Sequence, residues 1–352
     1  MRDPATGRAD VAAVMEERTA DAGAKKRRTA TVRAVVLAAV FVAIVFAVNL
    51  LAHGNFLAPG NLTNVLRQIS VNAMMAVGQT FVIITAGIDL SVGSLVALSS
   101  VVTAIVSNAL PFGGPLNFIV TLLAGLAVGC AAGYVNAVPV VRLNLPPFIT
   151  TLAMMQMARG IAFELAHGQP IPLTQSGAVQ WLGTGYLFPG IFGLPGIPYQ
   201  VILMALVVVV FAIVLGRTPF GRYVLALGGN EEAARLAGID TGRMKTLVYV
   251  ISGGCAALAG LVLTSRFSSG APQNGTGYEL QAIAAVVVGG TSLMGGRGTI
   301  IGTFFGALLI GVLNNAMNLL NVEAYTQLVV LGVVILLAVI LDHLRKRSTA
   351  GG

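Results

Sequence analysis

The sequence predicts an all-α membrane protein that crosses the bilayer about ten times, with its N- and C-termini in the cytoplasm. Three observations favour this fold class. Hydrophobic residues make up 56% of the 352 residues, charged residues 10%, and the mean hydropathy is +0.86, which is not a soluble composition. The apolar residues form segments long enough to span a bilayer. The basic residues cluster at the ends of those segments, which favours a membrane over nucleic acid as the partner of the positive charge.

The chain starts with a basic tail, residues 1–33, that lacks the apolar core of a cleavable signal peptide near Met1. We expect this tail to be cytoplasmic and disordered. A transmembrane domain, residues 34–341, and a short cytoplasmic tail, residues 342–352, follow. The first predicted span is 34–52. The other nine apolar segments are 69–87, 92–110, 117–141, 148–166, 200–215, 246–264, 280–293, 298–320 and 325–341.

The distribution of basic residues supports this topology. With the N-terminal tail in the cytoplasm, 18 of the 21 Lys and Arg residues fall on the cytoplasmic side. Arg67 and Arg266 fall outside, and Arg159 lies within a span. Ten spans also return the basic C-terminal tail to the cytoplasm, as the positive-inside rule requires. Cys130 and Cys255 lie in apolar segments, which predicts buried thiols without a disulfide or metal role.

One predicted extracytoplasmic loop, residues 167–199, is crowded with Pro and Gly and carries the single tryptophan, Trp181. A loop of this length at the membrane surface suits a lid or a docking platform. A passive connection lying among the lipid headgroups is the alternative, and the sequence favours neither.

Polar residues within the apolar spans are costly in hydrocarbon and usually face the bundle interior. They are densest in the stretch from 78 to 100, where a helix break is expected at Gly87 and Asp89 follows it. Capping of the next helix is the favoured role of Asp89, and a role in the translocation path is the alternative. A Gly-x-x-Leu-x-x-Gly pattern recurs weakly at 290–296. Our candidates for the translocation path or its gating are Gln79, Thr85, Gly87, Asp89, Ser91, Gly93, Gly290 and Gly296.

The longest polar segment inside the apolar part of the chain is the predicted cytoplasmic loop 217–245. Its middle predicts a short helix that begins after an N-cap at Asn230 and stops at Gly238. Acidic residues occupy its first turn, where the helix dipole favours them. Such a helix is either an ordinary solvated loop helix or a docking element for a soluble partner. The candidate docking residues are Asn230, Glu231, Glu232, Ala233, Ala234, Arg235 and Gly238.

Three stretches together resemble the ribose/xylose-type sugar permeases of bacterial ABC importers. They are GQTFVIITAGIDLSVGS at 78–94, GRYVLALGGNEEAARLAGI at 221–239 and GGTSLMGGRGTIIG at 289–302. The resemblance covers the chain from about residue 55 to residue 341, and the long charged N-terminal tail departs from it. Glu232, the two alanines after it and Gly238 match the EAA pattern of importer permeases, in which this segment is the coupling helix that docks on the ATPase.

The resemblance implies a translocation subunit for a monosaccharide in the bacterial inner membrane. Its implied partners are a cytoplasmic ABC ATPase, an extracytoplasmic sugar-binding protein, and a second permease copy or sister permease. The sequence contains no Gly-x-x-x-x-Gly-Lys-[Ser/Thr], so we expect no ATP or other cofactor on this chain. An ion-coupled secondary transporter is the alternative, with Asp89 and Glu164 as its few acidic candidates. An intramembrane enzyme is least favoured, because no catalytic constellation is evident.

Overall fold

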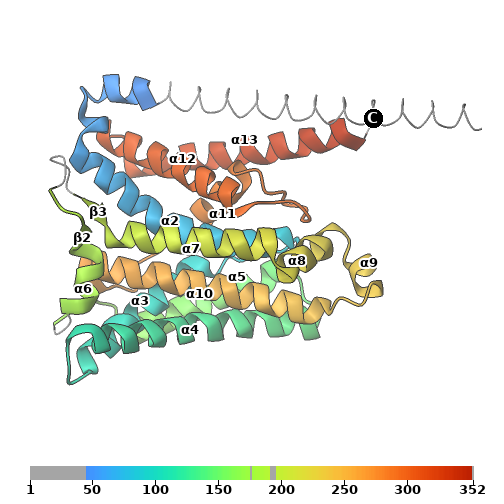
Figure 1. Cartoon of the computed structure of the whole chain (residues 1–352), viewed down its shortest axis with the longest axis horizontal. Coiled ribbons are helices and arrows are strands. Elements are labelled where there is room, and N and C mark those ends of the chain that lie inside the picture. Colours follow the sequence, from blue (N-terminus) through green and yellow to red (C-terminus); the bar gives the residue numbers. More distant parts are fainter. Residues whose placement is uncertain (1–44, 175–176, 191–195, 351–352) are drawn as a thin grey trace, which may run out of the picture. The chain divides into compact units, whose positions relative to one another are not determined.

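The computed structural model describes residues 45–174, 177–190 and 196–350, and this part of the chain is mostly helical (Figure 1). The long helices carry few internal breaks because their interiors are rich in Ala, Leu and Val, and several have Pro in the first turn, where it is tolerated. The helices are η1 (Asn55–Leu57), α2 (Pro59–Ile84), α3 (Val92–Ala109), α4 (Gly114–Arg142), α5 (Pro147–Leu165), α6 (Gly177–Thr184), α7 (Tyr199–Arg217), α8 (Pro219–Gly229), α9 (Glu231–Leu236), α10 (Thr241–Phe267), α11 (Tyr278–Val288), α12 (Ile300–Leu319) and α13 (Ala324–Ala350).

Four two-residue strands complete the list: β1 (Ile171–Pro172), β2 (Tyr186–Leu187), β3 (Ile197–Pro198) and β4 (Ser269–Gly270). They form two antiparallel pairs, β1 with β4 and β2 with β3. Because β1 and β4 lie on opposite sides of α10 in the sequence, their pairing joins the Pro/Gly-rich segment to the end of that helix.

The chain divides into two compact units, residues 1–56 and residues 57–352. The predicted tail 1–33 and most of the first predicted span, up to residue 44, lie outside the described residues. The rest of that span is helical from residue 45 to residue 51. In the second unit, each predicted span from 69–87 onward overlaps a helix, and the largest boundary error is at α2, which starts at Pro59.

By length and composition alone, five helices of the described residues are long and apolar enough to cross a membrane: α3, α4, α7, α10 and α12. The predicted span 280–293, whose boundaries and helical or re-entrant form the sequence leaves open, contains most of helix α11 and extends beyond its end. Helix α11 has 11 residues, which gives a length of about 16 Å against a hydrocarbon core of about 30 Å. It ends where Gly289 and Gly290 interrupt the apolar pattern, and Gly290 has a φ of 90°.

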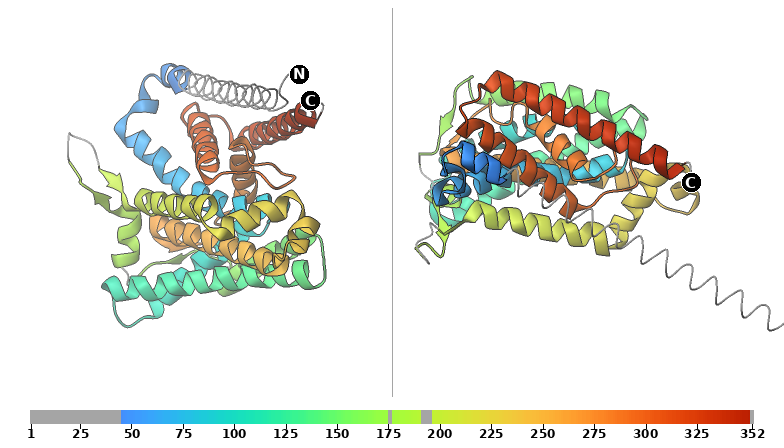
Figure 2. Two further views of the ribbon diagram at one scale, coloured as in Figure 1. Left: turned by 45° about the vertical axis from the view of Figure 1, so that its right-hand side comes forward. Right: turned by 90° about the horizontal axis from the view of Figure 1, so that it is seen from above.

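Helix α10 lies at the centre of the second unit and packs against α2, α3 and α4. It is buried over most of its length, and it lies side by side with α4 in both Figure 1 and Figure 2. Glycine permits this contact: a Cβ at Gly133 would lie 2.2 Å from the Tyr249 carbonyl oxygen, and one at Gly253 would lie 2.0 Å from the Gly129 carbonyl oxygen. Small residues at these positions let the two backbones approach, as is common between membrane helices.

The helices α2–α5 and α10–α13 repeat the same arrangement in opposite directions. Each set consists of a long helix, a linker without helical structure, a second helix that starts inside the bundle, and two further helices. Helix α10 packs on α3 and α4, while α2 packs on α11 and α12; likewise α3 contacts α5, and α11 contacts α13. Helices α2 and α10 run antiparallel (Figure 1). Gly78 of α2 lies against Ser252 of α10, and Gly87, three residues after the end of α2, lies against Tyr249, which comes earlier in α10. This is the pattern of an inverted repeat.

The second unit places the candidate elements at opposite ends of its helices (Figure 1). Helices α8 and α9 lie at one end, beside the C-terminal end of α4 and the start of α10. Residues of α4, α9 and α10 line a cavity at this end. Helix α6 and strands β2 and β3 lie at the other end. The linker at 85–91 leads from the first end into the interior.

Candidate functional site

The linker between α2 and α3 carries a fully buried carboxylate, that of Asp89. Its Oδ1 accepts hydrogen bonds from the Ser91 backbone N–H at 2.9 Å and from the Ser91 hydroxyl at 2.6 Å. Its Oδ2 accepts one from the Ser252 hydroxyl in the middle of α10, at 2.8 Å. No cation lies within ion-pair distance in the described residues, where the one ion pair is Lys245–Glu231. Hydroxyl and backbone donors therefore satisfy this carboxylate.

Three further side chains hold the linker in place. The Gln79 amide of α2 hydrogen-bonds to the backbone N–H and carbonyl of Asp89, at 3.1 and 3.2 Å. Asn136 of α4 donates to the Ser91 hydroxyl at 2.9 Å, and Thr151 of α5 donates to the Ile88 carbonyl at 3.1 Å. The linker thus joins α2, α4, α5 and α10 through hydrogen bonds, although it has no regular structure of its own.

Asp89 serves the start of α3, but it is not the N-cap residue. Ser91 occupies that position, and its own side chain makes no capping bond. Asp89 instead bonds the N–H two residues ahead, an Asx-type turn. The helix break is also shifted from the predicted Gly87: Thr85 is the C-cap of α2 and its hydroxyl bonds the Val82 carbonyl, while Ala86 takes the left-handed conformation with φ of 60°.

The recurring Gly-x-x-Leu-x-x-Gly pattern is not a structural repeat. Gly290 and Gly296 have φ of 90° and 73°, whereas Gly87 and Gly93 are not left-handed. Gly93 is the second residue of α3, and a Cβ there would lie 2.2 Å from a carboxylate oxygen of Glu279, in the first turn of α11. The starts of α3 and α11 therefore meet inside the bundle, which is where helix ends line solute sites in transporters with inverted repeats.

The end of α8 meets the end of α2 and the loop after α11 through backbone atoms. The Gly296 N–H donates to the Ile84 carbonyl at 2.9 Å. A Cβ at Gly228 would lie 1.7 Å from that same oxygen, and one at Gly295 would lie 2.7 Å from the Gly228 carbonyl oxygen. No side chain fits in this contact. The polar loop 217–245 therefore abuts the residues that precede the Asp89 linker.

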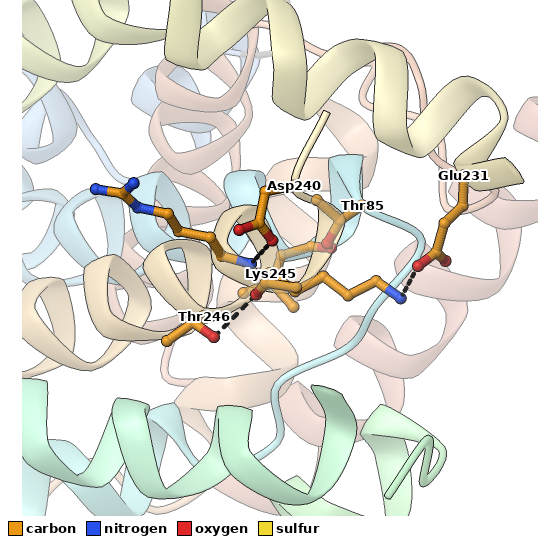
Figure 3. Close-up of polar contacts among 8 residues, drawn as sticks. Thr85, Glu231, Asp240, Lys245 and Thr246 are labelled. Atoms are coloured by element: carbon orange, nitrogen blue, oxygen red, sulfur yellow. Dashed lines mark hydrogen bonds and ion pairs between the residues drawn. The ribbon is translucent and has the colours of Figure 1, made fainter. Parts of the chain in front are cut away.

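Helix α9 has the predicted caps. The Asn230 side chain accepts from the Ala233 N–H at 2.9 Å. At the other end Gly238 is left-handed with φ of 85°, and the Ile239 N–H donates to the Ala234 carbonyl at 3.1 Å, which closes a Schellman-type turn. Glu231 forms an ion pair with Lys245 of α10 at 2.6 Å (Figure 3). This pair ties the short helix to α10.

The exposed face of α9 differs from the predicted one. Ala234 is buried within the chain, so it is not available to a partner, whereas Ala233, Glu232 and Arg235 are exposed. Leu236, an apolar residue between the two predicted caps, is 82% exposed at the end of the helix. A cavity of about 520 Å³ separates α9 from the end of α4, lined by Glu231, Glu232, Arg235 and Lys245 among others.

At the other end of the unit, the described part of the segment 167–199 is attached at several points. Trp181 of α6 stacks on Tyr199 with ring centroids 3.9 Å apart, and the Ser265 hydroxyl of α10 donates to the Val179 carbonyl. The Arg67 guanidinium lies 5.0 Å from the Tyr186 ring centroid. Despite these contacts, Trp181 is 55% and Phe188 61% exposed. Exposed aromatic side chains are common both on protein-binding surfaces and at the membrane–water interface.

Comparisons with known proteins agree with this architecture. Residues 61–339 match the model of a family described as branched-chain amino acid transport system, permease component. The chain is 46% identical to a ribose import permease protein of Escherichia coli K12 over 295 residues, 83% of this chain and 88% of the relative. It is 46% identical to the ribose import permease protein of Bacillus subtilis 168 over 297 residues, 84% and 87% of the two chains.

A third relative, an L-arabinose transport system permease protein of Escherichia coli K12, is 38% identical over 317 residues, 87% of this chain and 90% of that one. No solved structure matches the chain. The matched region contains both the Asp89 linker and the α9 loop, but it excludes the N-terminal tail.

The hydrogen bonds of Asp89 predict different outcomes for two substitutions. In Asp89→Asn, the amide oxygen keeps the bonds from Ser91, and the amide N–H₂ can donate to the Ser252 hydroxyl, so we expect nearly unchanged thermal stability. Asp89→Ala leaves the donors of Ser91 and Ser252 buried without an acceptor, which should cost about 2–4 kcal/mol. Melting temperatures of the purified variants in detergent provide the measurement. A large loss in Asp89→Asn would show that the negative charge itself is required.

Proposed function

The chain belongs to the family of transport-system permease components, and on that premise we propose that it forms the translocation path for a monosaccharide such as ribose. It is the multi-pass, membrane-spanning subunit of an inner-membrane importer of the ABC type and is not an enzyme. The family description names amino acids, but the relatives cited above carry the names of ribose and arabinose permeases. Identity of 46% over 83% of the chain to a ribose permease is the observation that carries the sugar proposal.

The proposed complex has four kinds of component. ATP is bound and hydrolysed by a cytoplasmic ATPase, and an extracytoplasmic binding protein delivers the sugar to the platform formed by α6, β2 and β3. A second copy of this chain, or a sister permease, completes the path. Exposed apolar side chains on α5 and α13, such as Ile161 and Leu336, support burial against another chain or lipid. An ion-coupled mechanism is not favoured, since Asp89 has its hydrogen bonds filled by neutral donors.

The proposed topology keeps ten crossings with both termini in the cytoplasm. Two crossings are composite, each made of a linker and a helix that starts inside the bundle: residues 85–91 with α3, and residues 268–277 with α11. The ends of the helices support the orientation, because the α9 loop and the C-terminal end of α13 lie at the same end in Figure 1. Both segments are basic, which supports a cytoplasmic location for that end.

Cysteine labelling tests the orientation. In a background with Cys130 and Cys255 replaced by Ala, single cysteines at the exposed positions Leu236 and Phe188 should react on opposite sides of the membrane. A membrane-impermeant maleimide added to intact cells should label Phe188→Cys alone, and inverted vesicles should give label at Leu236→Cys alone. The reverse pattern, or label at both positions from one side, contradicts the topology.

Uptake tests the function itself. The permease, expressed together with a cognate ATPase and binding protein in a strain lacking its own pentose permeases, should confer ATP-dependent uptake of radiolabelled ribose. Arabinose, xylose and fructose serve as competitors that define the selectivity. A strain without the permease gene is the control for leakage. Uptake driven by a proton or sodium gradient in the absence of ATP would support the secondary transporter instead.

The α9 face predicts how the permease meets its ATPase. Leu236→Asp places a charge where an exposed leucine would enter an apolar groove, and Ala233→Trp overpacks the same contact by about 1–3 kcal/mol. Both should leave the permease in the membrane while the ATPase fails to co-purify and uptake falls at least about tenfold. Exposed Leu116, near the opposite end, gives the matched control Leu116→Asp. Normal co-purification of the α9 variants would place the docking surface elsewhere.

A further inference from the structure

The hydroxyl of Tyr249 is buried and has no hydrogen-bond partner in the described part of the chain. Tyr249 lies in α10, and its side chain is 1% exposed. A buried hydroxyl without a partner costs about 1–3 kcal/mol, and proteins rarely leave one in place. Phenylalanine would fill the same space without that cost, so the hydroxyl calls for an explanation.

The position of Tyr249 relates it to the buried carboxylate. Tyr249 precedes Ser252 by three residues, so the two side chains lie on the same face of α10, about one turn apart. The Ser252 hydroxyl donates to Asp89 at 2.8 Å. The Tyr249 hydroxyl lies 2.9 Å from the point where a Cβ on Gly87 would stand, and it is within electrostatic range of Asp89. The linker thus runs along α10 from Tyr249 toward Ser252.

Gly87 keeps open the space between the Tyr249 hydroxyl and the linker. A side chain at this position would overlap the hydroxyl and would also lie 3.1 Å from Val82. With glycine there, the linker and α10 can move past each other without collision between side chains. Tyr249 and Ser252 are three residues apart on α10, a rise of about 4.5 Å along the helix axis.

The coupling end of the molecule supplies a reason for such a shift. Lys245, one turn before Tyr249 on α10, holds α9 through Glu231. On the other side, Gly228 of α8 abuts Ile84, which leads into the linker. A displacement of α9 by a partner is therefore transmitted both to α10 and to the segment that α10 contacts. Both sets of contacts therefore act on the contact between α10 and the linker.

We propose that Tyr249 is a second donor to the Asp89 carboxylate, replacing Ser252 when α10 shifts along the linker during transport. This inference rests on the proposed function, because the shift requires a partner that moves α9. Exchange of one donor for the other keeps the buried carboxylate hydrogen-bonded in both states. A buried carboxylate that lost Ser252 without a substitute would carry a large penalty.

The test removes one hydroxyl and compares two states of the assembled complex in proteoliposomes. Tyr249→Phe should lower the ATP-driven uptake of radiolabelled ribose about tenfold, which corresponds to about 1.4 kcal/mol. Its complex should melt at the same or a higher temperature than the original without nucleotide, and at a lower temperature when trapped with ATP and vanadate. Ser252→Ala should show the opposite dependence, with its loss concentrated in the nucleotide-free complex.

Thr103→Val is the matched control, because Thr103 of α3 is a second buried hydroxyl without a partner in the described residues. It should leave uptake and both melting temperatures unchanged. Undiminished uptake by Tyr249→Phe overturns the inference. An equal fall in both melting temperatures, or failure of the variant to accumulate, also overturns it, because the hydroxyl would then act in the present state. Failure of the proposed function is distinct, since the original complex would then show no ATP-dependent uptake.

Discussion

A carboxylate buried among membrane helices must have its oxygens occupied, and the arrangement of the second unit depends on how Asp89 meets this requirement. Its donors come from the linker itself and from Ser252 in the central helix. An isolated charge in hydrocarbon would be prohibitive, but hydroxyl and backbone donors reduce the cost. The result fixes the depth at which α3 begins, because Ser252 lies near the middle of α10. Helix α3 therefore starts inside the bundle.

Close backbone contact is the second condition of this architecture. Lipid-facing helices gain nothing from the hydrophobic effect when they associate, so their interfaces rely on close packing and interhelical hydrogen bonds. Glycine provides this packing at two places with different consequences. Between α4 and α10 it brings the backbones of two long helices into close contact. Glycine also lets the end of α8, the end of α2 and the loop after α11 come together through contacts between backbone atoms. Helix α10 thus packs closely on α4, and the coupling loop reaches the residues that precede the Asp89 linker.

The sequence predicted which segments are helical better than it predicted the depth in the membrane at which each helix begins. Apolar length and basic flanks located the long helices α3, α4, α5, α7, α10, α12 and α13, and capping chemistry located the ends of α9, because both signals are local. Helices α6 and α8 were not predicted. The partial depth of α3 and α11 depends on Asp89 meeting Ser252 and on Gly93 meeting the start of α11. Hydropathy contains no information about those long-range contacts. The same limit explains Ala234: sequence marks it as apolar and small, but only the fold shows that its own chain covers it.

The Asp89–Ser252 bond also sets an order of events during synthesis of the chain. Its two residues are 163 positions apart, and translation adds about 5–20 residues per second. Roughly ten to thirty seconds therefore pass between the emergence of the carboxylate and the emergence of its donor. Helix α2 precedes this interval, and α3, α4 and α5 are made during it, before the helix that fills the centre of the bundle. The first half of the repeat cannot reach its final packing until the second half has begun to insert, and the membrane insertion machinery must hold a polar, half-finished bundle until then.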